Sequence, residues 1–312
     1  MVGMIIRTEH LSRSFGTVKA VDDLNLEVPP GIIFGFLGPN GAGKTTTIHL
    51  LLGLIPPMQG QASVLGLDVG KQGDEIRARC GALLEFSGLY ERMSAEDNLD
   101  LYGRIYKMPH AERSARIREL LVHLDLWDRR KDRVGTWSRG MKQKLAVARA
   151  LLHHPALIFL DEPTAGFDPV AAAELREDLA NLVAHEGVTV FLNTHNLTEA
   201  ENLCAKVGVI REGKLLAVGS PEDLRMNHRA PKVEIIGQGF TEDIANTLRQ
   251  SAEVARVDLR PDRLEIELHT ENDRNAPLVS LIVQNGGEVE EIHRGEASLE
   301  DVFLTLMKEE ER

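Results

Sequence analysis

The sequence has little cysteine, no long apolar run and no excess of positive charge. Its two cysteines, Cys80 and Cys204, lie far apart and neither belongs to a Cys-x-x-Cys pair, so a disulfide framework or a zinc site has no support. The first ten residues lack a basic segment followed by an apolar core, and we expect nothing in the chain to span a bilayer. Acidic residues outnumber basic ones 48 to 36, which argues against a nucleic-acid partner.

Two domains are expected, because 312 residues exceed the usual size of one domain. Residues 1–229 alternate short apolar strands with helices, as in an α/β nucleotide fold, and a helical insert interrupts this alternation at about residues 90–136. Residues 230–312 read β-α-β-β-α-β, which is typical of a small ferredoxin-like α+β domain. Ser298 is then predicted to cap a closing helix.

Two local patterns support the helical insert. Ser94 is followed by Asp97 three residues later, which resembles a capping box at the start of a helix. A second helix is predicted from an apolar face made of Ile117, Leu120, Leu121 and Leu124.

A phosphate-binding loop lies between a predicted strand and a predicted helix. Residues 38–45, "GPNGAGKT", fit the pattern G-x-x-x-x-G-K-[ST] in full. The glycines let the backbone approach phosphate oxygens, Lys44 is placed to reach the β- and γ-phosphates, and Thr45 can offer its hydroxyl to Mg²⁺. A glycine-rich turn without a ligand is the disfavoured alternative. The predicted nucleotide-binding residues of this loop are Gly38, Pro39, Asn40, Gly41, Ala42, Gly43, Lys44, Thr45 and Thr46.

Two adjacent carboxylates follow the buried strand "ALIFL". Asp161 is placed at the strand end to hold Mg²⁺ through water, and Glu162 is placed to orient or deprotonate the attacking water. A solvated turn would also accept two acids, but the phosphate-binding loop in the same chain favours the catalytic interpretation.

In the order and spacing of these motifs, residues 4–224 resemble the ATP-binding-cassette ATPases. The resemblance implies that Phe15 stacks on adenine and that His195, in "NTHNLTEAE", bridges the γ-phosphate and Glu162. It implies that "TAGFDP", with Asp168 as its acid, crosses between two cassettes. Glu85 stands where the family places a glutamine that contacts Mg²⁺ and the membrane partner. A core Phe15 and a solvent-facing Glu85 are the alternatives.

The basic segment "WSRGMKQK", residues 137–144, resembles the family signature Leu-Ser-Gly-Gly-Gln, with Ser138 and Gly140 kept. Ser138 is predicted to cap a helix, and each cation in the first helical turn opposes the helix dipole by about 0.3–1 kcal/mol unless an anion binds there. The resemblance implies that Ser138, Arg139 and Gly140 contact the ATP held by a second chain. A solvated basic helix face and a degenerate, slow site are the alternatives.

The fold implied by the resemblance is an α/β P-loop NTPase cassette with a helical insert, followed by the small α+β domain. The function implied is an ATPase that drives transport, most simply export, from the cytoplasmic face of the membrane. Two copies, or one copy and a paralogue, would close on two ATP and Mg²⁺ and drive a separate permease. The closing "SLEDVFLTLM" resembles export-type subunits, and we expect the small domain to support dimerisation or regulation. An ATP-gated regulatory or soluble cassette protein is the alternative.

Overall fold

The computed structural model describes residues 3–165, 167, 169–227, 232–268, 275–295 and 298–309. The chain forms two compact units, Met1–Pro221 and Glu222–Arg312. The domain boundary predicted at Arg229 lies outside the described residues and stays a prediction. Across the described ranges, no helix combines the length and the apolarity that crossing a bilayer requires.

A six-stranded sheet forms the centre of unit 1. Its strand order is β10 (Lys214–Gly219), β9 (Lys206–Arg211), β3 (Ile33–Leu37), β8 (Thr189–Thr194), β7 (Leu157–Asp161) and β6 (Cys80–Leu83). The β9–β10 hairpin is antiparallel and the other pairs are parallel. Apolar runs such as "IFGFL" form its inner strands, because a parallel sheet is covered on both faces. The carboxyl ends of β3, β7 and β8 therefore lie at one edge, where α/β sheets bind their ligands.

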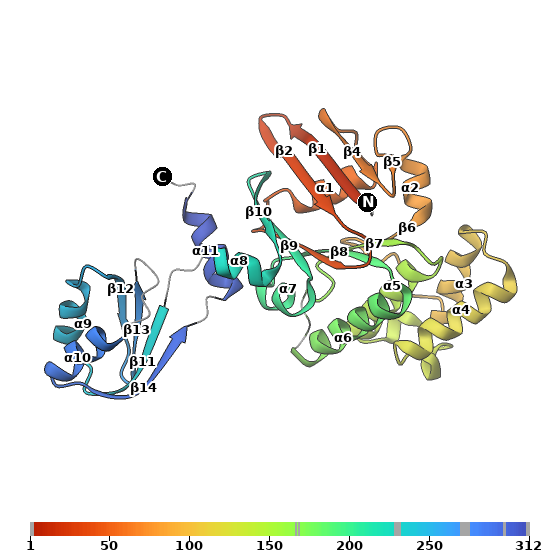
Figure 1. Ribbon diagram of the computed structural model, residues 1–312. Coiled ribbons are helices and arrows are strands. Elements are labelled where there is room, and N and C mark those ends of the chain that lie inside the picture. The colour runs from red at the N-terminus through yellow and green to blue at the C-terminus, as the bar shows by residue number, and fades with distance from the viewer. Residues whose placement is uncertain are drawn as a thin grey trace. The chain divides into compact units, whose positions relative to one another are not determined.

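A second, antiparallel sheet belongs to the same unit. Its order is β2 (Val18–Val28), β1 (Ile6–Phe15), β4 (Gln59–Val64) and β5 (Leu67–Asp68), with Ile6 opposite Val28 and Val64. Helix α1 (Lys44–Leu51) packs against this sheet (Figure 1). One cluster of buried apolar side chains joins this sheet to the central sheet. The shared core includes Ile6 and Leu11 of β1 and Ala42 of the loop before α1, so the strand and the loop are packed into one core.

The helical part of unit 1 lies between β6 and β7 in the chain. Its elements are α3 (Ala95–Ile105), α4 (His110–His123), the short 3₁₀ helices Trp127–Arg129 and Val134–Thr136, and α5 (Arg139–Leu151). The Ser94 hydroxyl accepts the Asp97 backbone N–H at 3.1 Å, which confirms the predicted cap. The apolar face predicted for α4 is buried, as expected. The remaining helices of the unit are α2 (Gly73–Arg79), α6 (Pro169–Glu186) and α7 (Leu197–Leu203).

Helix α8 (Pro221–Asn227) begins at the last residue of unit 1, and its other residues belong to unit 2. Unit 2 contains an antiparallel sheet of order β12-β13-β11-β14 with helices α9 and α10 (Figure 1). The elements are β11 (Lys232–Gln238), α9 (Glu242–Arg249), β12 (Val254–Leu259), β13 (Arg263–Leu268), α10 (Ala276–Gln284), β14 (Glu288–Gly295) and α11 (Leu299–Glu309). The predicted β-α-β-β-α-β order is confirmed. Ser298 caps α11, since its hydroxyl accepts the Asp301 N–H at 3.2 Å.

Candidate functional site

The phosphate-binding loop connects β3 to α1, and two of its glycines cannot be replaced without movement. A Cβ at Gly38 would lie 2.3 Å from the Ile210 carbonyl oxygen. Gly43 has a φ of 104°, and a Cβ there would lie 2.0 Å from the Ala20 carbonyl oxygen. The loop is thus packed closely against neighbouring backbone on one side. On its other side it lines a pocket of about 240 Å³.

Lys44 is the first residue of α1 and is 6% exposed. Its ammonium donates to the carbonyl oxygens of Gly38 at 2.7 Å and Pro39 at 3.1 Å. Burial lowers the pKa of Lys44, although the nearby carboxylates of Glu162 and Asp161 oppose the shift. The ammonium therefore lies between the loop and two acids, where a polyphosphate would meet a positive charge inside the loop.

Three oxygen-bearing side chains meet beside Lys44 in the same pocket. The Thr45 hydroxyl donates to Asp161 at 3.1 Å, and the Asn193 amide nitrogen donates to the other Asp161 oxygen. Asn193 is 1% exposed, and its amide oxygen has no hydrogen-bond partner among the described residues. A buried acceptor without a donor is rare, and this one belongs to a residue that lines the phosphate pocket. The sequence motifs had not identified Asn193.

This corner has the composition that Mg²⁺ prefers. The ion is usually held by hydroxyl and carboxylate oxygens with several waters and the substrate's phosphates, so it does not need a cage of protein side chains. Within the described part of the chain, no group of three or more His, Cys, Asp or Glu side chains gathers to hold a metal. Thr45 and Asp161, with the unsatisfied oxygen of Asn193, therefore fit Mg²⁺ better than a metal that requires a closed site.

Glu162 follows β7 in a left-handed backbone conformation, with a φ of 52°. Such a conformation costs about 1–3 kcal/mol and persists only where the surroundings hold it. Its backbone N–H donates to the Asn193 carbonyl oxygen at 2.9 Å, and its carboxylate lies 2.7 Å from Nδ1 of His195. Asn193 of strand β8 thus holds the backbone of Glu162, and His195, directly after that strand, contacts its side chain. The two catalytic residues predicted from the sequence are in contact.

Glu85 and Arg139 line a second pocket, of about 330 Å³, together with Thr45, Asp161 and Glu162. Glu85 is exposed, and it lies on the wall of a pocket shared with the proposed metal corner. The sequence prediction had placed Arg139 toward a second chain. In this single chain it lines a pocket with the chain's own acids.

The signature segment begins α5. The Ser138 hydroxyl accepts the Met141 backbone N–H at 3.3 Å, so the predicted cap is present. A Cβ at Gly140 would meet only Phe167 at 3.9 Å and Ser138 at 4.0 Å, so nothing among the described neighbours requires a glycine there. Close approach by a group from outside the chain would explain it.

The two lysines of that segment have partners within the chain. Lys142 lies 2.6 Å from Glu91, and Lys144 lies 3.3 Å from Glu174 and 3.2 Å from Asp178. These ion pairs neutralise two of the three cations that the sequence offered for an anion. The signature prediction therefore depends on Arg139, Ser138, Gly140 and the free N–H groups of the helix.

The last two predicted nucleotide contacts differ in what the structure shows. Phe15 is 49% exposed at the end of β1, and the Arg13 guanidinium lies 5.0 Å from the centre of its ring. An exposed ring with a cation on one face leaves the other face open to a base. Asp168 lies outside the described residues.

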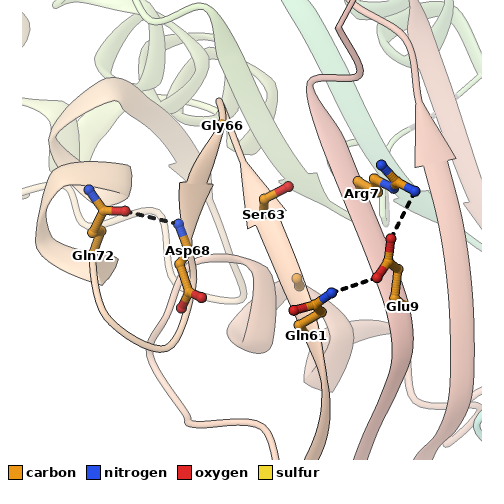
Figure 2. A pocket seen from close by; sticks show the side chains of 8 residues that line it. Arg7, Glu9, Gln61, Ser63, Gly66, Asp68 and Gln72 are labelled. Carbon is orange, nitrogen blue, oxygen red and sulfur yellow. Dashed lines mark hydrogen bonds and ion pairs between the residues drawn. The ribbon is translucent and has the colours of Figure 1, made fainter.

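Another pocket, of about 300 Å³, lies on the antiparallel sheet and contains none of the predicted site residues (Figure 2). Its polar groups bond to one another: Arg7 to Glu9 at 2.8 Å, Gln61 to Glu9 at 2.5 Å, and the Asp68 N–H to Gln72 at 3.2 Å. With these groups already paired, the pocket offers little to a polar ligand.

Two family models match the chain. Residues 21–165 match the model described as ABC transporter, and residues 219–307 match the C-terminal domain of DrrA1-3-like ATP-binding proteins. The first match includes the phosphate-binding loop, the signature segment, Asp161 and Glu162.

Relatives of similar length match along almost the whole chain. The bacitracin transport ATP-binding protein BcrA of Bacillus licheniformis is 38% identical, with 97% of each chain covered. The Nod factor export ATP-binding protein I of Cupriavidus metallidurans is 37% identical, with 99% of each chain covered. The daunorubicin resistance ATP-binding protein DrrA2 of Streptomyces coeruleorubidus is 35% identical, with 98% of this chain and 96% of the relative covered.

Solved structures give the same result for the fold. An ATP-binding subunit of an ABC transporter matches with a TM-score of 0.65 and 31% identity, over 72% of this chain and 92% of that chain. A nucleotide-free ATP-binding cassette from an ABC transporter matches with a TM-score of 0.63 and 26% identity, over 70% and 91%. The predicted fold class is confirmed.

Proposed function

The chain belongs to the ATP-binding subunits of ABC transporters, and from this premise we propose which residues bind and hydrolyse ATP and what the hydrolysis drives. The chain is an ATPase. The observation that carries the residue assignment is the meeting of Lys44, Asp161, Glu162 and Asn193 around one pocket. A cationic loop for phosphates, an oxygen-rich corner and a carboxylate held by a histidine are the parts that phosphoryl transfer to water requires.

In this proposal the loop residues 38–46 bind the phosphates through backbone N–H groups, and Lys44 neutralises the β- and γ-phosphates. Phe15 stacks on adenine. Thr45 and Asp161 hold Mg²⁺, with Glu85 and Asn193 beside them, and the bound ion would offset the charge of the phosphate oxygens.

Glu162 orients the attacking water and accepts its proton, while His195 holds the Glu162 carboxylate and reaches toward the γ-phosphate. Glu162 lines the pocket, and its left-handed backbone is held by the hydrogen bond that its N–H donates to the Asn193 carbonyl oxygen and by the contact of its carboxylate with His195.

Two copies of the chain, or one copy and a paralogue, close on two ATP molecules in the proposed cycle. Ser138, Arg139 and Gly140 of one chain contact the nucleotide held by the other, with Asp168 in the loop between them. No described neighbour within the chain requires a glycine at position 140. This supports the arrangement, because a second chain that approaches this position closely would require one. Closure pushes on a separate permease, which holds the subunit at the cytoplasmic face of the membrane, and hydrolysis reopens the pair.

We further propose that the transporter exports its substrate. Full-length relatives include a daunorubicin resistance protein and a Nod factor export protein, and the similarity extends through the C-terminal domain. Copurification from detergent-solubilised membranes with the tagged chain should yield a protein with several membrane spans. Transport in inverted vesicles containing that protein should then be inward and require ATP. Outward transport from such vesicles would contradict export.

The test of the residue assignment is Glu162→Gln. An amide cannot take the proton from water, so phosphate release should fall by about a thousandfold or more while ATP still binds. ATP should also hold the variant as a dimer, measured by size-exclusion chromatography. Glu75→Gln, an exposed change in α2, is the matched control and should behave as wild type. Normal turnover in Glu162→Gln would contradict the assignment.

A further inference from the structure

A second bridge joins the turns that carry Glu162 and His195, and it passes through Glu199, to which no motif assigns a role. Glu199 lies in the first turn of α7, and its side chain is fully buried. Each carboxyl oxygen accepts one hydrogen bond from a threonine hydroxyl: Oε1 from Thr164 at 2.9 Å and Oε2 from Thr194 at 2.6 Å. A buried carboxyl group needs such partners, because leaving it unbonded away from water is costly.

The two hydroxyls come from different turns of the proposed site. Thr164 lies two residues after Glu162, in the loop that follows β7, and Thr194 ends β8 directly before His195. The Thr194 oxygen also accepts the Asn196 N–H at 3.0 Å, so its own proton is directed to Glu199. Because each threonine donates to a separate oxygen, the carboxyl group links the turns without competition between them.

Glu199 itself is held in place. Asn196 caps α7 by accepting the Glu199 backbone N–H at 3.0 Å. With the His195–Glu162 contact on one side and the Thr194–Glu199–Thr164 bridge on the other, the two turns are linked twice by side chains. A displacement of one turn is therefore transmitted to the other.

We propose that Glu199 is a positioning residue, which keeps Glu162 and His195 in their working relation and couples both to the loop that begins at Thr164. The inference rests on the proposed roles of Glu162 and His195. Glu162 has a left-handed backbone, and its neighbours must hold it there. In the sequence, Thr164 is followed four residues later by Asp168, the acid predicted to cross toward a second chain. Contact with that chain would reach both catalytic residues through Thr164 and Glu199.

A purely structural role makes a different prediction. Removing a buried hydrogen-bonding group anywhere in unit 1 should lower stability without a selective loss of turnover. Measuring kcat, KM and the unfolding temperature separately distinguishes the two roles, because a positioning role lowers kcat in a protein that is still folded. Among the described residues, Lys44 bonds to the Gly38 and Pro39 carbonyl oxygens and Thr45 bonds to Asp161, so neither side chain contacts Glu199 or its threonines. Nucleotide binding should therefore persist when the bridge is lost.

The experiment measures kcat, KM for ATP and thermal unfolding of the full-length chain with Glu199→Ala, Glu199→Gln, Thr164→Val and Thr194→Val. Glu199→Ala should lower kcat by about tenfold to a hundredfold, because misplacing a catalytic group by about 1 Å can cost a hundredfold. KM should change by less than about threefold. Glu199→Gln has the same shape and can still bond to both threonines, so it should recover part of the lost kcat.

A double variant tests the bridge directly. If Thr164 acts through Glu199, Thr164→Val combined with Glu199→Ala should lower kcat no further than Glu199→Ala alone. Thr8→Val is the matched control, because Thr8 is buried in β1 and its hydroxyl donates to the Leu24 carbonyl oxygen at 2.9 Å. It should lower the unfolding temperature and leave kcat unchanged.

Three results would overturn the proposal: an unchanged kcat in folded Glu199→Ala, multiplicative losses in the double variant, or an equal fall in kcat with Thr8→Val. If Glu199→Ala does not fold, Glu199→Gln and Thr164→Val decide by the same criteria. Glu162→Gln is assayed alongside. If that variant is inactive while Glu199→Ala is normal, the bridge proposal alone fails, whereas normal turnover in Glu162→Gln contradicts the proposed function first.

Discussion

Nδ1 of His195 lies 2.7 Å from the carboxylate of Glu162, although 33 residues separate them in the chain. The contact exists because β7 and β8 are neighbours in the parallel sheet, with Asp161 opposite Asn193. Glu162 and His195 each follow one of these strands at the same sheet edge. In the proposed mechanism, this contact lets His195 orient the Glu162 carboxylate without acting as a base.

We expect His195→Ala to lower kcat for ATP hydrolysis by about a hundredfold, because Glu162 would lose the partner that orients it. Nucleotide affinity should fall less than kcat, since in the proposal most of the phosphate contacts come from the loop around Lys44. Phosphate release and binding of a fluorescent ATP analogue measure the two quantities. His185→Ala removes an exposed histidine of α6 and serves as the control. If His195→Ala retained full turnover, the orienting role would be excluded.

Asn193→Leu should weaken Mg²⁺-dependent nucleotide binding by about tenfold, which is the usual cost of losing a group that orients a metal ligand. Leucine keeps the size of the side chain but removes the donor to Asp161 and the unsatisfied oxygen. Binding is titrated with Mg²⁺ in the Glu162→Gln background, so the readout does not depend on turnover. Asn202→Leu, on the exposed side of α7, is the control. Equal Mg²⁺ titrations of Asn193→Leu and Asn202→Leu would exclude a role of Asn193 in Mg²⁺ binding.

Glu85→Gln should be tolerated, because an amide oxygen can take the place of a carboxylate oxygen near Mg²⁺ and removes a negative charge from the pocket. Glu85→Ala should hydrolyse ATP but transport less substrate per ATP, since it removes the contact proposed for the permease. The ratio of transport to phosphate release in vesicles measures this coupling. Glu112→Ala, exposed on α4, is the control. The same ratio of transport to phosphate release in wild type and both Glu85 variants would show that Glu85 has no role in coupling.

Arg139→Ala should lower ATPase activity by at least about tenfold, whereas Lys142→Ala should stay near wild type. Arg139 lines a pocket with Asp161 and Glu162, whereas Lys142 is paired with Glu91 near the surface, where such a pair contributes about 0–1 kcal/mol. Paired assays of kcat under identical ATP and Mg²⁺ concentrations provide the comparison. Equal effects of the two changes would favour a solvated basic face over a nucleotide contact.

The parts of the site that could be predicted from the sequence are contiguous in the chain. The loop around Lys44 and the helix caps at Ser138 and Ser298 depend on neighbours within a few residues, so local patterns identify them. Asn193 and Glu199 could not be identified in this way. The role proposed for Asn193 depends on the pairing of β7 with β8, which places Asn193 opposite Asp161. The role proposed for Glu199 depends on Thr164 and Thr194, which bond to its two carboxyl oxygens.

The same limit applies to charge. A cluster of three cations in the signature segment predicted an anion, but Lys144 is paired with Glu174 and Asp178, which lie in α6. Such partners are distant in sequence and become neighbours only through packing of α5 and α6. The sequence therefore showed that cations gather at the start of α5. Only the fold shows that Lys142 and Lys144 are paired within the chain, whereas Arg139 lines a pocket.

The proposal that each ATP site is shared between two chains leads to the strictest test. Lys44→Ala removes the phosphate contact of the loop, and Gly140→Asp places bulk and negative charge where the γ-phosphate of the other chain would lie. The fold should tolerate the second change, because a Cβ at Gly140 would meet no atom of the described residues closer than 3.9 Å. Each variant alone should be inactive.

A mixed dimer of these two variants should recover part of the activity. One of its sites contains both substitutions, whereas the other combines the unchanged Lys44 of one chain with the unchanged Gly140 of its partner. A site built within a single chain allows no such recovery, because every molecule then carries a lesion in its own site. The measurement is phosphate release from separately tagged variants purified as verified mixed dimers. The matched reference is a dimer of wild type with either variant. If the reference is active while the mixed dimers are as inactive as the parent variants, the shared site is excluded, and Ser138, Arg139 and Gly140 must act within their own chain.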